Sequence, residues 1–255
     1  MTNALTSKLP NVTTTIFTVM SQLAAEHGAI NLSQGFPDFS APAELMDLVA
    51  EHMRAGRNQY APMTGVPLLR QRIAEKTTAL YKAAIDADAE VTVTSGATEA
   101  LFAAITAVVR AGDEVMIFDP AYDSYVPAIE LSGGIPLRLK LRAPDYCIDW
   151  NEVAARISDR TRLIIINSPH NPTGATLEAH DLEHLAGIIR DRNVFVLADE
   201  VYEHIVFDGR SHQSVLRHPE LRERSFVISS FGKTYHVTGW KVGYCVAPRA
   251  LSAEF

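Results

Sequence analysis

Cysteine is scarce in this 255-residue sequence, and positive charge is outnumbered. Cys147 and Cys245 are the only cysteines, and they stand far apart with no metal-binding spacing around them. We expect both to be reduced core residues of a cytoplasmic protein, because disulfides are rare in that compartment. The 23 Lys and Arg residues face 30 Asp and Glu residues, which gives a formal net charge of −7. That balance disfavours a general affinity for nucleic acids or acidic membranes.

Long apolar runs are absent as well. The longest apolar pieces are short, such as Leu163–Ile166, far below the roughly 18 residues that cross a membrane. The first 30 residues contain one Lys, no Arg and only scattered apolar residues, so no secretory signal is predicted. We expect a cytoplasmic protein without membrane or nucleic-acid partners.

What the sequence does contain is an alternation of short apolar strands and helical stretches. Strands that are apolar throughout suit a sheet buried on both faces. The alternation predicts an α/β fold, a three-layer sandwich with a mainly parallel central sheet. The predicted strands are Glu90–Thr94, Glu114–Phe118, Ile135–Leu139, Arg162–Ile166, Val194–Ala198, Ser225–Ser229 and Lys241–Val246. The predicted helices cover residues 13–26, 42–54, 64–80, 97–110, 122–131, 149–157 and 178–191.

Polar residues follow the ends of four of these strands. Ser95, Asn171, Asp199 and Lys233 each lie just beyond the carboxyl end of a predicted strand. In open α/β sheets, ligands bind at that edge. The sequence therefore predicts one ligand-binding crevice there.

The segment Ser95–Thr98 passes from a strand into the start of a helix. Free backbone N–H groups and the positive end of the helix dipole bind anions at such a point, and the hydroxyls of Ser95 and Thr98 can add donors. Simple N-capping by Ser95 is the alternative. Ser230 and Lys241 would complete a phosphate site.

Lys233 follows the apolar strand Ser225–Ser229 and carries the chemistry that we expect in this crevice. A lysine amine is the nucleophile that carbonyl cofactors need, and desolvation with nearby positive charge such as Lys241 would lower its pKa. A solvated loop lysine is the ordinary alternative. A nucleotide-binding P-loop is excluded for Gly232–Thr234, because that motif needs a glycine where Val227 stands.

Four further side chains suit a pyridine-ring cofactor. Asp199 ends a buried strand, where a pyridinium N–H is a suitable partner that keeps the ring an electron sink. Tyr202 and Asn171 can hydrogen-bond a phenolic oxygen, and Tyr122 can stack on an aromatic ring. Each of three has an ordinary alternative: turn capping for Asp199, a turn for Asn171 and core packing for Tyr122.

Two other polar groups are assigned no chemistry. His180 and His184 are four residues apart, but the zinc-protease order of residues is missing, so we expect a polar helix face and no metal site. Glu200 and Glu203 are expected to stabilise the turn around Tyr202.

In this order along the chain, the motifs resemble those of the fold-type I, pyridoxal-phosphate-dependent class I and II aminotransferases. Within them the likeness is greatest to the branch of methionine, glutamine and kynurenine aminotransferases, and it spans essentially the whole chain. The segments that carry it are Asn31–Phe39, Asn58–Gly65, Ser95–Ala100, Pro169–Gly174, Asp199–Tyr202, Ser229–Tyr235 and Gly239–Gly243.

The resemblance implies transamination of an L-amino acid, with a methionine or aromatic donor favoured, and a 2-oxo acid as acceptor. Lys233 would hold pyridoxal 5′-phosphate as a Schiff base and move the proton, while Asp199 pairs with the ring nitrogen. Tyr202 and Asn171 would bond the ring oxygen, and Tyr122 would stack on the ring. The phosphate would lie on Ser95, Gly96, Ala97, Thr98, Ser230 and Lys241.

The resemblance also implies a homodimer and a particular division of the chain. Tyr60 would reach the phosphate of the neighbouring subunit, and Gly35 would lie with Asn171 near the substrate. Relatives continue well beyond the position of Phe255. We therefore expect residues 1–40 to be an N-terminal arm with part of a small domain, and residues 41–255 to be the large cofactor-binding domain. The rest of the C-terminal small domain would be absent.

Other functions stay open at this point. A lyase on the same fold would eliminate at Cβ of cysteine conjugates, and a truncated chain could be catalytically inactive. A transcription regulator built on this domain would need an N-terminal DNA-binding module, and residues 1–40 contain no basic helix-turn-helix.

Overall fold

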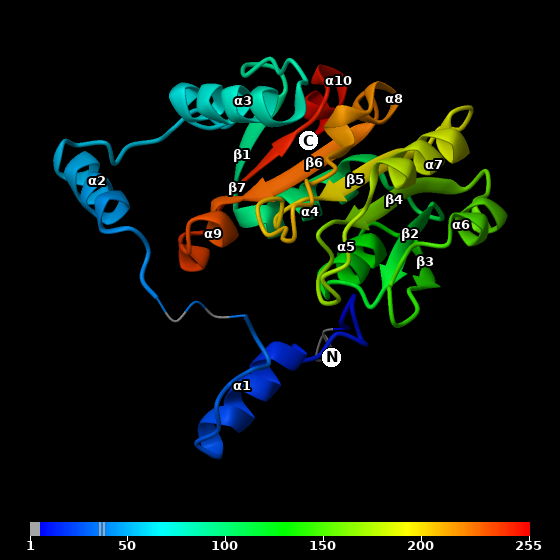
Figure 1. Cartoon of the computed structure of the whole chain (residues 1–255), viewed down its shortest axis with the longest axis horizontal. Helices are drawn as coiled ribbons and strands as arrows, with labels where there is room; N and C mark the ends of the chain where they lie inside the picture. The colour runs from blue at the N-terminus through cyan, green and yellow to red at the C-terminus, as the bar shows by residue number, and fades with distance from the viewer. Residues whose placement is uncertain (1–5, 36, 38) are drawn as a thin grey trace, which may run out of the picture.

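A seven-stranded sheet organises the chain (Figure 1). The computed structural model describes residues 6–35, 37 and 39–255. The strand order across the sheet is β1-β7-β6-β5-β4-β2-β3. The strands are β1 Val91–Ser95, β2 Glu114–Asp119, β3 Ile135–Lys140, β4 Thr161–Asn167, β5 Phe195–Asp199, β6 Ser225–Ser230 and β7 Val242–Val246.

Most neighbouring strands run parallel. The pairs β2–β3, β2–β4, β4–β5 and β5–β6 are parallel, whereas β7 runs antiparallel to both β1 and β6. This confirms the predicted α/β fold with a mainly parallel sheet. Because β7 runs against its neighbours, its first residue lies at the same edge as the last residues of β1 and β6.

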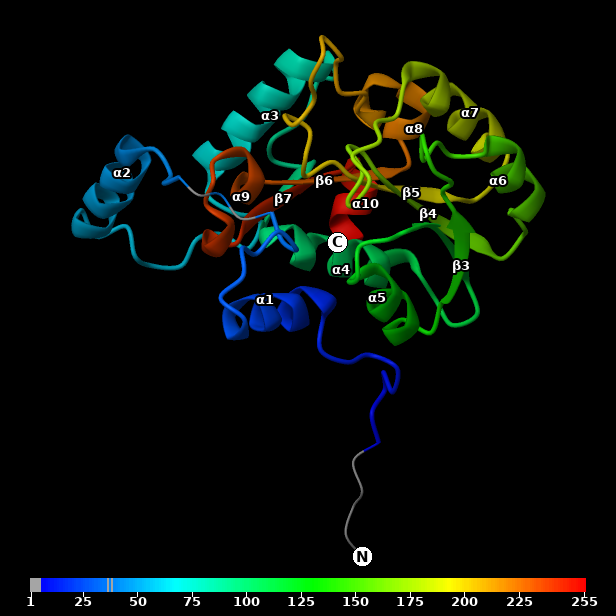
Figure 2. The same cartoon turned by 60° about the horizontal axis from the view of Figure 1, so that its bottom comes forward.

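Helices cover both faces of the sheet. In Figure 2, α3, α6, α7 and α8 lie over one face, and α4, α5 and α10 lie over the other. The α-helices are α1 Ile16–Glu26, α2 Ala43–Arg54, α3 Pro67–Tyr81, α4 Gly96–Val108, α5 Tyr125–Leu131, α6 Trp150–Arg156, α7 Ala179–Ile189, α8 Pro219–Arg222, α9 Phe231–Thr234 and α10 Arg249–Glu254. Two 3₁₀ turns, η1 Val215–Arg217 and η2 Thr238–Trp240, complete the set.

Each face of the sheet has its own apolar core, which explains the continuous apolar strands. On β4, Leu163 and Ile165 pack with α4 and α5, whereas Ile164 and Ile166 pack on the opposite side with α3 and α7. Successive side chains of a strand point to opposite faces, so a strand with two buried faces must be apolar throughout.

The two cysteines differ in position. Cys245 is buried on β7, as the sequence predicts, whereas Cys147 is exposed. The predicted core position is wrong for Cys147, because this residue lies in the loop between β3 and α6.

The helices α1, α3 and α5 each begin three residues later than the sequence predicts, and α3 shows a structural reason. Residues 64–66 form a loop, and α3 begins at Pro67, which occupies the first helical turn. Gly65 has a φ of 102°, and a Cβ there would lie 2.5 Å from a Val93 methyl carbon. The loop therefore packs directly on β1, in a conformation that a helix does not allow.

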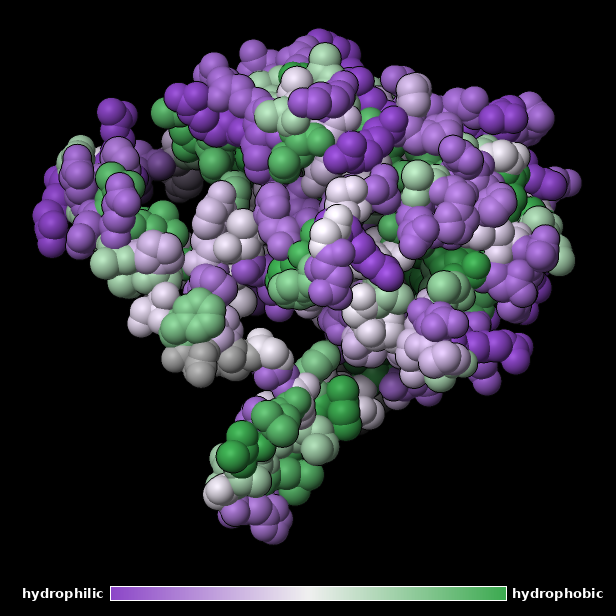
Figure 3. All heavy atoms as spheres, viewed as in Figure 1, coloured by the Kyte–Doolittle hydropathy of each residue, from purple (hydrophilic) through white to green (hydrophobic). Residues whose placement is uncertain are grey.

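The helices α1 and α2 lie apart from the sheet. Neither buries any residue, and both stand away from the layered part in Figure 1. Apolar residues remain at the surface of α1 in Figure 3. Within the described ranges, no helix has the length and apolar character needed to cross a membrane.

Candidate active site

Strand register brings the predicted polar residues to one edge of the sheet. Ser95 pairs with Val242, and Ser230 pairs with Gly243, so β1, β6 and the start of β7 meet there. Asn167 pairs with Asp199 at the carboxyl ends of β4 and β5. Ligands bind at this edge in open α/β sheets.

Lys233 lies on α9, a single helical turn that begins directly after β6. Its Nζ lies 5.4 Å from the centre of the Tyr202 ring. Partial burial lowers the pKa of Lys233, and the positive charge of Lys241 lowers it further, while Asp199 opposes the shift. A larger share of the amine is therefore neutral, the form that attacks a carbonyl carbon.

Asp199 is the buried carboxylate of the site, with 4% of its surface exposed. Burial raises its pKa to about 6, although hydrogen bonds from Tyr125 and Val201 and the charge of Lys233 pull the other way. The Tyr125 hydroxyl donates to Oδ2 at 2.6 Å, and the Val201 backbone N–H donates to Oδ1 at 3.4 Å. Asp199 is mainly ionised at neutral pH and can pair with a cationic N–H group.

Asn171 is tied to the same place through the backbone. Its N–H donates to Asn167 Oδ1 at 2.7 Å, and Asn167 Nδ2 donates to the Asp199 carbonyl oxygen at 2.8 Å. Asn167 therefore fixes the Asn171 loop to the end of β5. Asn167 is not among the predicted site residues, because its only signal in the sequence is its position at the end of an apolar strand.

The start of α4 forms a close-packed cradle against β7. A Cβ on Gly243 would lie 2.4 Å from the carbonyl carbon of Gly96, so this approach requires glycine at position 243. Gly96 has a φ of 77°, and a Cβ there would lie 3.7 Å from the Lys241 Cα. The Ser95 side chain does not cap α4, and the Ser95 N–H is bonded by the Glu99 carboxylate.

This cradle has the donors of an anion site. α4 is 13 residues long, and its first turn contains Ala97 and Thr98, whose N–H groups lie at the positive end of the helix dipole. Lys241 lies next to Gly96, and Ser230 is buried at the end of β6. The structure thus gathers the six predicted phosphate residues at one end of the sheet.

Three predicted residues are arranged differently. Tyr122 is half-buried, and its ring meets that of Tyr125 edge to face at 5.7 Å. Tyr60 is fully exposed, and Gly35 is exposed with nothing within 4 Å of a Cβ placed on it. Phe36 and Asp38 of the same motif as Gly35 lie outside the described residues.

Glu203 anchors the turn that carries Tyr202. Its carboxylate accepts hydrogen bonds from Lys76 at 2.6 Å, Ser229 at 2.8 Å and Tyr244 at 3.2 Å, and a further one from Tyr81. These donors come from α3, β6 and β7. The predicted stabilising role of Glu203 in this turn agrees with these contacts.

The Glu200 carboxylate makes a similar buried connection. It pairs with His212 at 2.9 Å and accepts the Val215 N–H at 3.1 Å. The carboxylates of Glu200 and Glu203 are therefore both buried and hydrogen-bonded.

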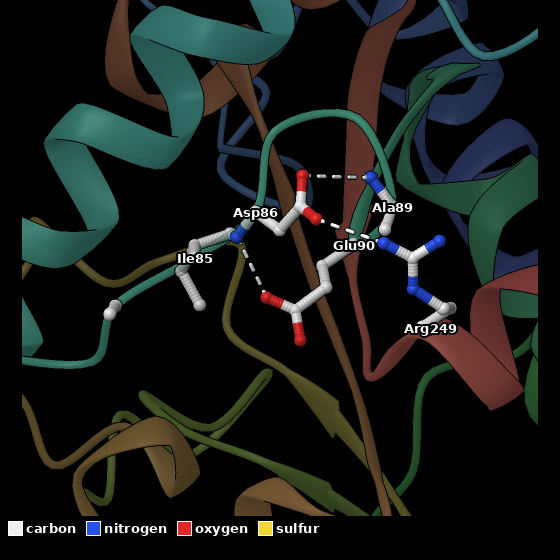
Figure 4. Close-up of a pocket in the computed structure, with 6 residues that line it drawn as sticks. Ile85, Asp86, Ala89, Glu90 and Arg249 are labelled. Atoms are coloured by element: carbon white, nitrogen blue, oxygen red, sulfur yellow. Dashed lines mark hydrogen bonds and ion pairs between the residues drawn. The ribbon is translucent and has the colours of Figure 1, made fainter.

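A separate cavity of about 300 Å³ lies elsewhere (Figure 4). It is lined by residues between Ala84 and Glu90 and by Arg249, whose guanidinium is 3.1 Å from Asp86. None of the predicted site residues lines it. Asp86 is paired with Arg249 within this cavity, and Glu90 is paired at 3.5 Å with Arg222, which does not line it.

Comparison with known proteins identifies the family. Residues 27–254 match aminotransferase class I and II. A methionine aminotransferase of Escherichia coli is 60% identical over 248 residues, 97% of this chain and 64% of that protein. A probable N-succinyldiaminopimelate aminotransferase of Mycobacterium tuberculosis is 40% identical over 250 residues, 97% of this chain and 63% of that protein.

Solved structures agree. The crystal structure of YbdL from Escherichia coli, described with a methionine aminotransferase function, matches with a TM-score of 0.96 and 59% identity over 98% of this chain and 66% of that one. The chain thus spans less than two thirds of the length of these relatives. From its sequence match and its fold, the chain belongs to the class I and II aminotransferase family.

Proposed function

We propose that this chain forms the cofactor-binding part of an aminotransferase, which moves an amino group from an L-amino acid to a 2-oxo acid with pyridoxal 5′-phosphate. The observation that carries the proposal is the meeting of Lys233 and Asp199 at one sheet edge. The amine has a lowered pKa there, and the carboxylate is buried yet mainly ionised. A nucleophilic amine and an acid partner for a ring nitrogen are the groups that this cofactor needs.

The residues present fit the cofactor. The phosphate would have the α4 amides, Ser95, Ser230 and Lys241 as donors. The close approach of Gly96 and Gly243 holds the start of α4 against β7. Lys241 supplies charge but not the bidentate fork of an arginine.

The ring would be held by four side chains. Asp199 would pair with the ring nitrogen, and Tyr202 and Asn171 would bond the phenolic oxygen. Tyr122 would stack on the ring, which is compatible with its half-buried position. When bound, the cofactor withdraws electrons from the substrate Cα–H bond and so acidifies it.

Lys233 would then act on protons. Its Nζ would be the atom that holds the cofactor. The free amine would accept the proton that leaves the substrate Cα. Its lowered pKa suits this task, because a general base works best when its pKa is near the working pH.

Residues 6–66 would contribute through assembly and substrate contact. Tyr60 is fully exposed and free to contact a second subunit, which supports a homodimer in which it reaches the neighbouring phosphate. Gly35 would lie with Asn171 near the substrate. The division into residues 1–40 and 41–255 and the cytoplasmic location remain part of this proposal.

A methionine or aromatic amino donor is favoured. Identity is 60% to the methionine aminotransferase and 40% to the N-succinyldiaminopimelate enzyme. No observation on the described residues favours elimination at Cβ over amino transfer.

The test traps the cofactor on the chain. The purified chain is incubated with pyridoxal phosphate, reduced with borohydride and digested, and the labelled peptide is identified by mass spectrometry. We expect one label, on Lys233. Labelling of other lysines without Lys233, or of none, would overturn the proposal. Amino transfer from L-methionine and L-aspartate to a common 2-oxo acid then tests the donor, and equal rates would remove the methionine preference.

A further inference from the structure

Tyr125 connects the core of the molecule to Asp199. It is the first residue of α5 and is 3% exposed. Its ring belongs to the apolar cluster that includes Ile129 and Leu197, and its hydroxyl donates to Asp199 Oδ2 at 2.6 Å. A polar tip on a rigid buried ring is a fixed donor.

Asp199 has few other partners. Among the described residues, Tyr125 is the only side chain that hydrogen-bonds its carboxylate. Lys233 attracts the carboxylate, and Glu200 repels it. The Glu200 charge is itself bonded to His212.

The donor and acceptor roles in this pair are fixed. Burial and the Asp199 charge raise the pKa of Tyr125 well above its ordinary value, with weaker effects from Tyr122 and Tyr202. The hydroxyl therefore stays protonated and can only donate to the carboxylate. Asp199 Oδ1 keeps spare acceptor capacity, because its one hydrogen bond is the long contact from Val201.

We infer that Tyr125 is a positioning residue for the proposed reaction, which holds Asp199 through Oδ2 in its anionic form and leaves Oδ1 for the cofactor ring nitrogen. The inference rests on the proposed function. Tyr125 touches neither the amine of Lys233 nor the phosphate residues in any hydrogen bond of the described structure. It would act through Asp199 alone.

The first experiment needs no cofactor. Carbon NMR of chain labelled with ¹³C in the aspartate carboxyl groups follows Asp199 through a pH titration, and Asp199→Asn identifies the resonance. Tyr125→Phe keeps the ring and removes the hydroxyl. We expect the titration midpoint of Asp199 to rise by about one pH unit, because a hydrogen bond that favours the ionised form is lost.

Tyr81→Phe is the matched control. Tyr81 is also buried and also donates to a carboxylate, but to Glu203. The Asp199 midpoint should stay where it is in this variant. An unchanged midpoint in Tyr125→Phe, or an equal rise in Tyr81→Phe, would overturn the inference.

The second experiment measures the dissociation constant of pyridoxal phosphate at pH 7. Tyr125→Phe should weaken binding about twofold in the wild-type background, because a rise of about one unit from a pKa of about 6 lowers the ionised share of Asp199 at pH 7 from about nine-tenths to about half. It should have no further effect in the Asp199→Asn background. Equal losses in both backgrounds would show that Tyr125 acts independently of Asp199 and overturn the inference.

Two outcomes separate this inference from the proposed function. If the wild-type chain binds no cofactor while the NMR midpoint still rises in Tyr125→Phe, the proposed function fails and the hold of Tyr125 on Asp199 stands. If Tyr125→Phe does not fold, the double variant Tyr125→Phe/Asp199→Asn decides. Recovery of folding supports the pairing, and failure of both variants assigns Tyr125 to core packing and overturns the inference.

Discussion

Residues 67–255 and residues 6–66 differ in how much apolar surface their helices and strands bury. The first region buries apolar side chains on both faces of a sheet, whereas α1 and α2 in the second bury none. Helices of 11 and 12 residues are marginal in water without tertiary contacts. The first region therefore holds its own shape, whereas α1 and α2 depend on contacts that the sheet does not provide.

The candidate site follows the same division. Lys233, Asp199, Asn171 and the α4 cradle stand on elements fixed by the sheet register. Tyr60 is exposed in the region without a core. In the proposed function, chemistry that needs positions held to a fraction of an ångström would be carried by the packed region, and Tyr60 would contact a second subunit.

The largest difference between the regions should appear in catalysis. In the proposed function Lys233→Ala removes the amine that would hold the cofactor and accept the proton, so transfer from L-methionine should fall at least about 10⁴-fold. Lys8→Ala removes an exposed amine in the other region and should leave the rate unchanged. Initial rates at saturating pyridoxal phosphate measure both. Residual transfer in Lys233→Ala near the wild-type rate would contradict the role of Lys233.

The second largest difference between the regions should appear in the free energy of unfolding. Ile164→Ala deletes a side chain that is fully buried on β4 and should cost about 2–5 kcal/mol of unfolding free energy. Ile16→Ala deletes the same atoms from a residue that is 62% exposed on α1 and should change it by less than about 0.5 kcal/mol. Urea unfolding of the two variants makes the comparison. Similar losses would mean that α1 packs on the sheet in solution.

The third difference between the regions should appear in how their carboxylates affect stability at low pH. Burial opposes ionisation of Glu203, but the charge and hydrogen bond of Lys76 and the hydroxyl donors outweigh it and lower its pKa from 4.5 to about 2. A carboxylate whose pKa is lowered on folding adds stability above its unfolded pKa, and that stability is lost as the pH falls from about 4.5 toward 2. The contribution is on the order of 3 kcal/mol.

Glu203→Gln should therefore be less stable than the wild type at pH 7, and the two stabilities should converge near pH 2. Glu51→Gln, on the exposed α2 helix, should follow the wild-type curve at every pH. Thermal unfolding from pH 2 to pH 7 gives the curves. A constant gap between Glu203→Gln and the wild type would assign the loss to shape and not to charge.

The sequence predicts the positions of the strands in residues 67–255, but not the direction of every strand or the packing of the loops. Apolar runs such as Leu163–Ile166 locate the strands to within about two residues. The reason is that a strand buried on both faces must be apolar along its whole length. The antiparallel direction of β7 leaves no such trace, since direction depends on how the connecting segments cross the sheet. Gly65 likewise gives no sign that the preceding loop will pack on Val93.

The site shows the same limit. Lys233 and Asp199 are recognisable because a charged residue after a buried strand is conspicuous. Tyr125 is not, because a tyrosine in an apolar helix is read as core, and its bond to Asp199 spans 74 positions of sequence. Contacts of this kind are set by the register of the sheet and by helix placement, neither of which is local.

The smallest effect gives the cleanest comparison of the two regions, because it uses one interaction in two settings. Thr15 caps α1 by accepting the Thr18 N–H at 3.3 Å, and Asp149 caps α6 by accepting the N–H groups of Asn151 at 3.0 Å and Glu152 at 3.2 Å. Loss of a helix N-cap costs about 1 kcal/mol where the helix is coupled to the fold. Asp149→Ala should therefore lower the unfolding free energy by that amount.

Thr15→Ala should lower the helical signal in circular dichroism slightly and leave the unfolding midpoint unchanged, because α1 shares no core with the sheet. The midpoint in urea, read from the fluorescence of buried Trp150, distinguishes the two cases. A fall of equal size in both variants would require α1 to unfold together with the sheet, and the division between the two regions would then have to be abandoned.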